Sequence, residues 1–317
     1  MTVADTVPAN ESGVPEDLEQ AAVIFAGLRP RLFGIAYRML GSVTEAEDLV
    51  QDVWLRWQTC DRSTVANPAA FLATATTRLA INVAQSARVR RETYIGPWLP
   101  EPVDTSADPH LGAERGEALG FAVLLLLERL SPNERAAYVL REAFDYPYQE
   151  IADIIQLSEA AVRQLVSRAR KHVVAERRAP VTGAEQRRLL TAFVAAARSG
   201  DLAALEELFA ADVTSHSDGG GVVRASRIPV VGAFRVAKYV RAFADRFWDG
   251  VEVEWASANG QASALLCRDG EVFAVLTVNA SAQGIDQVLW MMNPAKITAV
   301  SASPSSAQIR PGHARQA

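Results

Sequence analysis

The chain has 317 residues, of which 22% are charged and 49% are hydrophobic, and its formal net charge is −5. This length allows two or three domains with cores of their own, and the acidic balance excludes a protein that binds nucleic acid over its whole surface. Cys60 and Cys267 stand alone, which excludes a disulfide scaffold. The longest dense apolar run, residues 121–127, is too short to span a bilayer. We therefore expect a soluble cytoplasmic protein without a metal or cofactor.

The N-terminal part predicts helices with recognisable ends. Residues 1–15 are polar and interrupted by prolines, which predicts disorder. An apolar helical pattern covers residues 16–40, with Pro30 as its expected break. Ser42 and Glu45 then form a capping-box signature that begins a second helix.

The second helix has two different faces. Its apolar stripe includes Trp54 and Trp57 and predicts a buried side. Asp48 and Asp52 line another side, next to Gln51. This acidic row is either a solvated surface or a docking surface for a basic partner, and its spacing leaves both interpretations open.

A third helix is predicted to begin at Asn67 and Pro68, a cap and first-turn pair. It ends in a cluster of arginines near Tyr94, a combination that suits phosphate neutralisation and base stacking, although a solvated helix end fits the composition equally well. Residues 95–111 are rich in proline and predict an extended linker. Apolar residues within this linker, Trp98 and Leu99, indicate that it docks on another segment.

A second helical block is expected over residues 112–178, and it contains a helix-turn-helix pattern at residues 148–171. Ser158 is the natural N-cap of its second helix, and Gln156 occupies the turn position where glycine is usual. The buried face of that helix is predicted to comprise Val162, Leu165, Val166, Ala169 and Val173. The opposite face, which either binds DNA or is merely solvated, comprises Arg163, Gln164, Ser167, Arg168, Arg170 and Lys171.

The C-terminal part changes character and predicts an α+β domain with a curved sheet wrapped on helices. Helices are expected over 189–197, 202–209 and 234–247. Strands are expected over 213–216, 222–224, 251–257, 262–267, 272–279 and 283–292. Residues 301–317 predict a loose tail.

The order of these motifs resembles an extracytoplasmic-function (ECF) sigma factor of the subgroup with a C-terminal SnoaL-like domain, over residues 18–299. The resemblance is carried by the strings AEDLVQDVWLRW, TRLAI, SARVRRE and SRARK, and further by YIGPWLPEP, DGGG and NPAKI. It implies two all-α sigma domains, the second with the helix-turn-helix, followed by an α+β SnoaL-like cone domain. The implied borders are 16–94 for region 2, 95–111 for the linker, 112–178 for region 4 and 184–300 for the cone.

The resemblance also implies a non-enzymatic role in transcription initiation, with the RNA polymerase core and promoter DNA as partners and no membrane partner. Two parts of the polymerase core would be bound, the coiled coil of its largest subunit and its flap region. Asp48, Gln51 and Asp52 would bind the coiled coil. The downstream promoter element would be held by Arg78, Arg88, Arg90 and Arg91. The upstream element would be contacted by Ser158, Arg163, Gln164, Ser167, Arg168 and Lys171.

The cone domain offers polar candidates for a pocket, namely Asp212, His216, Asp218, Trp255, Trp290 and Asn293. A hydrogen-bonding cluster at a strand end explains His216 and Asp218 more simply than an acid and base pair, while a small-molecule ligand stays open. We expect the glycines after Asp218 to receive the linker, so that the cone regulates the sigma domains in cis. The set expected to do so is Trp98, Leu99, Pro100, Glu101, Pro102, Asp218, Gly219, Gly220, Gly221, Asn293 and Pro294. The alternative is a ligand-sensing helix-turn-helix regulator.

Overall fold

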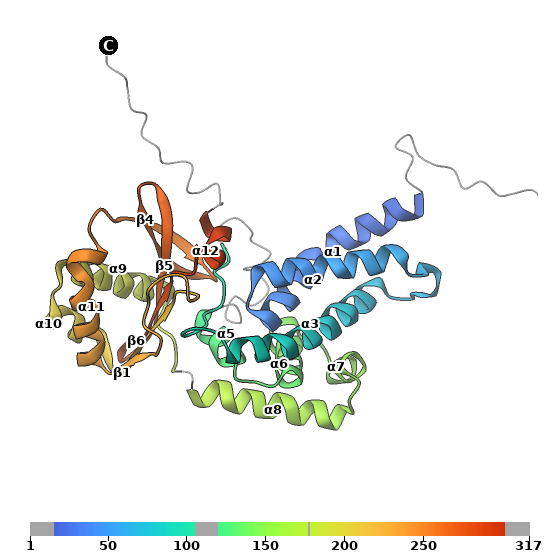
Figure 1. Ribbon diagram of the computed structural model, residues 1–317. Coiled ribbons are helices and arrows are strands. Elements are labelled where there is room, and N and C mark those ends of the chain that lie inside the picture. The colour runs from blue at the N-terminus through green and yellow to red at the C-terminus, as the bar shows by residue number, and fades with distance from the viewer. Residues whose placement is uncertain (1–15, 105–119, 177, 302–317) are drawn as a thin grey trace, which may run out of the picture. The chain divides into compact units, whose positions relative to one another are not determined.

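The computed structural model describes residues 16–104, 120–176 and 178–301 (Figure 1). The described chain falls into two compact units, which we treat separately. The first unit comprises residues 16–40, 44–87 and 130–169, and the second comprises residues 41–43, 88–104, 120–129, 170–176 and 178–301.

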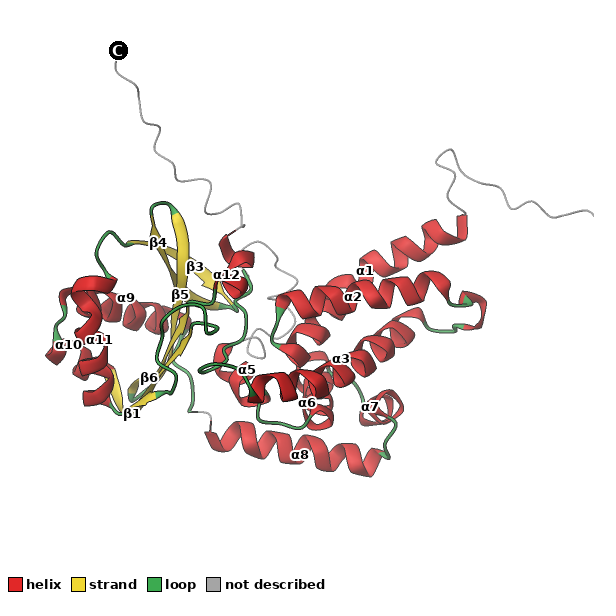
Figure 2. Ribbon diagram, viewed as in Figure 1, coloured by secondary structure: helices red, strands yellow, loops and turns green. Residues whose placement is uncertain are grey.

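The first unit is built from helices (Figure 2). They are α1 (Glu16–Leu40), α2 (Val43–Thr59), the 3-10 turn η1 (Arg62–Thr64), α3 (Pro68–Glu92), α6 (Pro132–Phe144), α7 (Tyr148–Ile155) and α8 (Glu159–Glu176). The first residue of α2 and the last residues of α3 and α8 belong to the second unit. Two of the helix starts are capped by side chains, and the first of them, at Asn67, confirms the prediction from the sequence. The Asn67 side chain accepts from the Ala70 N–H at 3.1 Å, and Ser131 forms a capping box with Glu134 at the start of α6.

Helix α1 runs through Pro30 without a break, so the prediction of a break there was wrong. A proline inside a helix removes one backbone hydrogen bond and costs about 3 kcal/mol. Apolar side chains pack on both sides of it, with Ala21 and Phe25 buried before it and residues 32–40 buried after it. Burial of these apolar side chains offsets the local cost, and Pro30 itself faces solvent.

The second unit contains a six-stranded mixed sheet in the order β2-β1-β6-β5-β4-β3. Its strands are β1 (Phe209–Asp218), β2 (Val230–Val231), β3 (Glu252–Ala258), β4 (Gln261–Arg268), β5 (Glu271–Ser281) and β6 (Gly284–Met291). Its helices are α5 (Phe121–Leu127), α9 (Gly183–Ser199), α10 (Leu202–Leu208), α11 (Ala233–Phe247) and α12 (Pro294–Ser301). Strands β1 and β6 pair in parallel, while the other neighbours are antiparallel.

Both faces of this sheet are buried, because successive side chains of a strand point to opposite sides. On β6, Val288 and Trp290 join the core formed with α9 and α11, whereas Leu289 and Met291 join a second core. That second core also contains Leu99 of the linker, together with Phe121 of α5 and Ile297 of α12. The linker is therefore part of a hydrophobic core on one face of the sheet.

The strand predicted at residues 222–224 was wrong. The backbone N–H groups of Val222 and Val223 both donate to the Gly219 carbonyl, so the chain turns there, and the short edge strand lies later, at Val230–Val231. Three consecutive glycines favour a turn over a strand because they readily adopt positive φ. Among the described residues, no helix has the length and apolar character that crossing a bilayer requires.

Candidate functional site

The helix-turn-helix forms as its sequence predicts. Gln156 ends α7 in the left-handed conformation with φ 57°, and the Ser158 hydroxyl accepts from the Ala161 N–H at 3.2 Å at the start of α8. The five side chains expected to be buried on α8 are buried, with Leu165 at 8% exposure the least so. This packing fixes which face of α8 is turned to solvent.

The solvent face of α8 is polar and basic. Arg163, Gln164, Ser167 and Arg168 are exposed and border one shallow hollow. The guanidinium of Arg163 pairs with Glu159 and lies 4.3 Å from the centre of the Tyr148 ring, while Arg168 pairs with Glu134 at 3.1 Å. The Arg163–Glu159 pair is exposed and therefore weak, so Arg163 can exchange this partner for a phosphate or a base edge.

Two of the four arginines expected at the downstream element are already engaged within the chain. The Arg78 guanidinium donates to the Ile154 carbonyl at 2.7 Å and to the Asp153 carbonyl at 3.0 Å. These are C-terminal carbonyls of α7, which have no partner within the helix. Arg91 pairs with Glu128. The side chains of the other two, Arg88 and Arg90, lie outside the described parts of the structure.

The acidic row on α2 is turned to solvent. Asp48, Gln51 and Asp52 are exposed, and the opposite side of α2 is buried through Leu49, Val50, Val53 and Trp57. The nearby Glu47 pairs with Arg29 of α1. The row is therefore geometrically available as a docking surface.

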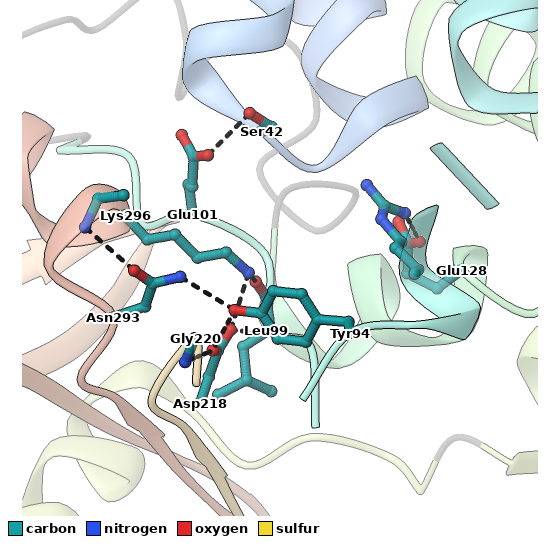
Figure 3. Close-up of polar contacts among 11 residues, drawn as sticks. Ser42, Tyr94, Leu99, Glu101, Glu128, Asp218, Gly220, Asn293 and Lys296 are labelled. Carbon is teal, nitrogen blue, oxygen red and sulfur yellow. Dashed lines mark hydrogen bonds and ion pairs between the residues drawn. The ribbon is translucent and has the colours of Figure 1, made fainter. Parts of the chain in front are cut away.

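The linker is held by a fully buried carboxylate, Asp218 at the end of β1 (Figure 3). One Asp218 oxygen accepts from the Tyr94 hydroxyl at 2.5 Å and from the Gly220 N–H at 3.0 Å. The other accepts from the Leu99 N–H at 2.9 Å and from the Lys296 ammonium at 2.7 Å. We call Tyr94, Leu99, Asp218, Gly220 and Lys296 the linker lock.

Lys296 is the cation of this lock. Its ammonium also donates to the Leu99 carbonyl at 2.6 Å and lies 4.2 Å from the centre of the Trp98 ring. Burial lowers the pKa of Lys296 to about 8, partly offset by the charge of Asp218. Burial also raises the pKa of the Tyr94 hydroxyl, and the hydrogen bond to Asp218 adds to this.

Two further sets of hydrogen bonds hold the linker in place. The Glu101 carboxylate accepts from the Ser42 hydroxyl and from the Val43 N–H, both at 2.7 Å. Farther along, Val103 exchanges hydrogen bonds of 2.9 Å with Asn259, one to its side chain and one from its backbone. The linker from residue 94 to residue 104 is thus ordered along its length.

The glycine run behaves differently from the expectation that it receives residues 98–102. Gly220 has φ +62°, and a Cβ there would lie 2.4 Å from the side-chain nitrogen of Asn293. A Cβ on Gly221 would meet Ile95 at 3.0 Å, and one on Gly219 would meet the Val223 carbonyl at 2.3 Å. The glycines therefore approach Ile95 and Asn293, while Asp218 makes the contact with Leu99.

The second unit also contains an open cavity of about 1250 Å³. Polar side chains from β1, β5 and β6 line it beside apolar residues of α5, and they include Thr214, His216, Asn279 and Gln287. His216 contacts Thr214 at 3.1 Å, and burial together with the charge of Arg129 lowers the pKa of its imidazole.

The structure separates the pocket candidates. Asp212 and His216 line the cavity, but Asp212 is paired with Arg178. Asp218 and Asn293 belong to the linker region, with Asn293 donating to the Tyr94 hydroxyl at 2.9 Å. Trp290 is buried among the core side chains of α9 and α11, and Trp255 is 42% exposed. No acid and base pair is assembled from these candidates.

Sequence reasoning missed Lys296 as a site residue and gave base stacking or a solvated helix end as the alternatives for the region of Tyr94. A lysine inside the apolar stretch of α12 was an available signal, because an unpaired buried ammonium is costly and demands a carboxylate partner. Asn259, in the turn between β3 and β4, gave no such signal.

Comparison with known proteins agrees with this arrangement. Family models for Sigma-70 region 2 and Sigma-70 region 4 match residues 24–92 and 120–173. The chain is 39% identical over 233 residues to the ECF RNA polymerase sigma factor SigJ of Mycobacterium tuberculosis, covering 72% of this chain and 74% of that protein. It is 35% identical over 213 residues to the probable ECF sigma factor SigI of the same species, covering 66% of this chain and 71% of that protein.

The crystal structure of M. tuberculosis SigJ covers 90% of this chain and 99% of its own, with a TM-score of 0.70 and 32% identity. That coverage includes the helix and mixed-sheet domain at the C-terminus. The chain therefore belongs to the ECF sigma factors and is an alternative RNA polymerase sigma factor that directs promoter-specific transcription initiation.

Proposed function

We propose that α2 docks on the polymerase core through Asp48, Gln51 and Asp52. The exposure of the row supports this, because carboxylates attract a basic partner and steer its approach. We propose likewise that the solvent face of α8 contacts the upstream promoter element. Its exposed Arg163 and Gln164 suit base edges, and Lys171 suits a phosphate.

Each surface has its own test. Reversing charge with Asp48→Lys and Asp52→Lys should weaken core binding at least tenfold in a pull-down titration, while Asp249→Lys, an exposed acid of the C-terminal domain, should not. Arg163→Ala should reduce discrimination between promoter and scrambled upstream sequence by about 1–3 kcal/mol. Unchanged core binding in the reversed variants would refute the docking assignment.

We further propose that the C-terminal domain regulates the factor in cis by holding the linker. The single observation that carries this proposal is the linker lock, in which a carboxylate with no exposed surface accepts hydrogen bonds from both Tyr94 and the Leu99 backbone. Farther along the linker, Glu101 also holds the Ser42–Val43 segment where α2 begins. A held linker restricts how far apart the two DNA-contacting modules can move.

The experiment is run-off transcription with purified core polymerase on a promoter that the factor is shown to use. The full chain is compared with Asp218→Asn and with a chain ending at Arg178, and Asp249→Asn serves as a matched exposed control. We expect Asp218→Asn to change transcript yield in the same direction as the truncation. Wild-type yield from Asp218→Asn, in a variant whose linker amides exchange faster, would refute control through the lock.

A second proposal is that the cavity holds a small, uncharged polar molecule. Its volume of about 1250 Å³ exceeds the roughly 300–1,000 Å³ usual for ligand sites, so it has room for a small molecule. The amide groups of Asn279 and Gln287, 2.8 Å apart, lie on its lining beside His216. Native mass spectrometry of the freshly isolated chain should detect a bound compound that Gln287→Leu loses. Detection of the bare chain alone would argue against this ligand.

A further inference from the structure

The second unit carries a strongly basic helix face that no function above uses. Between residues 224 and 246 lie six of the twelve Lys and Arg residues found over 178–301, and the only acidic residue there is Asp245. Four of the six are on α11, namely Arg235, Lys238, Arg241 and Arg246. We call these four residues and Phe234 the α11 face.

Helix α11 is oriented by its apolar side. Val236, Ala237, Val240 and Ala244 are buried in the core between α11 and the sheet. At about 100° per residue, the four cations and Phe234 fall within a single arc opposite to this buried side, and all five are exposed. In Figure 1, α11 lies with α9 and α10 beside the same sheet.

The cations of the α11 face are not neutralised. Within the described parts of the chain, none of the four makes a hydrogen bond or ion pair through its side chain. Other exposed arginines are paired, such as Arg163 with Glu159 and Arg188 with Glu185. A concentrated row of unpaired cations in a chain of net charge −5 indicates a specific anionic partner.

The covalent connection to α8 indicates which partner. Helix α8 ends at Glu176 and α9 begins at Gly183, and the seven residue steps from one to the other can span at most about 25 Å. A duplex held by α8, in the contact proposed above on which this inference rests, would continue within reach of the domain that carries α11. From Arg235 to Arg246 the helix axis advances about 16 Å, which matches the rise of about five base pairs.

A membrane surface fits this face poorly. An interfacial helix inserts a continuous apolar side into the lipid, but here that side is already buried against the sheet. We propose that the α11 face binds the phosphate backbone of duplex DNA upstream of the site held by α8. The C-terminal domain would then add a third, sequence-independent DNA contact to those of the two sigma regions.

The test uses holoenzyme and a fluorescein-labelled promoter duplex, either extended by two helical turns upstream of the α8 site or ending at that site. The variant is Lys238→Gln with Arg241→Gln. The control is Arg187→Gln with Arg188→Gln, which removes two exposed cations from α9 of the same domain, of which Arg188 is paired with Glu185. Thermal melting checks that each variant folds as the parent does.

Loss of two phosphate contacts should make the slope of log affinity against log salt less negative by about 1.8. On the extended duplex, the ratio of the parent's affinity to the variant's affinity should therefore fall about tenfold between 50 and 200 mM salt. On the short duplex, and for the control on either duplex, no difference is expected. Equal slopes for variant and parent on the extended duplex would overturn the proposal. So would a loss confined to core binding, which would assign the face to an acidic protein surface.

Discussion

Replacing Lys296 by methionine tests the linker lock most directly. Methionine keeps much of the length of the side chain but removes the ammonium that pairs with Asp218 at 2.7 Å. Removing one partner of a buried ion pair costs about 3–5 kcal/mol, because the other charge stays buried. Asp218 keeps three donors, the Tyr94 hydroxyl and the N–H groups of Leu99 and Gly220, so we expect the lower end, about 3 kcal/mol.

The assay is hydrogen exchange of the peptide covering residues 95–104, followed by mass spectrometry at pH 7. A loss of about 3 kcal/mol in the free energy of opening corresponds to roughly hundredfold faster exchange of these amides. The lysine control is Lys238→Met, which removes an exposed and unpaired ammonium and should leave linker exchange unchanged.

The double variant Asp218→Asn with Lys296→Met removes both charges. We expect its linker to exchange more slowly than the sum of the two single-variant losses in opening free energy predicts. The reason is that no unpaired charge remains buried. If Lys296→Met exchanges within threefold of the parent, the ion pair does not hold the linker and the reasoning fails.

Three further predictions concern single positions. Gly220→Ala should weaken the linker lock by about 1–3 kcal/mol in the same exchange assay, because its Cβ would lie 2.4 Å from Asn293 at a positive φ. Arg78→Gln should lower the melting temperature of the helical unit, since it removes two hydrogen bonds to α7 carbonyls, worth about 1–3 kcal/mol together. The free energy of unfolding should rise from about pH 8 to pH 10. The reason is that the pKa of Lys296 is lowered to about 8 in the folded chain, whereas the unfolded chain keeps that proton to a higher pH. Above pH 10 the raised pKa of Tyr94 acts in the opposite direction, since the folded chain keeps its proton longer.

These predictions have matched controls. Gly27→Ala, on an open surface of α1 without positive φ, should be neutral or slightly stabilising, unlike Gly220→Ala. Arg56→Gln, an exposed arginine of α2, should melt as the parent does, and an equal loss in both arginine variants would contradict the role given to Arg78. The pH-dependent rise should vanish in Lys296→Met, and its persistence there would assign the titration to another group.

Much of the helical architecture could be predicted from the sequence because its signals are local. The cap at Asn67, the capping box at Ser131 and the turn at Gln156 each involve residues within four positions of one another. The two faces of α8 followed from its periodicity in the same way. The family could also be predicted from the sequence, because the order of the motifs along the chain does not depend on how the domains pack.

Contacts between distant segments escaped sequence reasoning. The prediction of a break at Pro30 considered only the local backbone cost of a proline in a helix. It did not include the burial of α1, which offsets that cost. Arg78 was expected to contact DNA because the residues near it in the sequence do not indicate that it binds α7 carbonyls. Those carbonyls lie more than seventy positions away. The role of Tyr94 was likewise invisible until the fold placed it 2.5 Å from Asp218.

The sequence by itself determined several helix ends, the buried and exposed faces of α8, the acidic row of α2 and the family. The tertiary structure alone decided that the linker is core rather than tether, and that one buried carboxylate and one lysine hold it. The physical reason is that periodicity and capping are properties of neighbouring residues. The pairing of buried charges depends on which distant segments exclude water together.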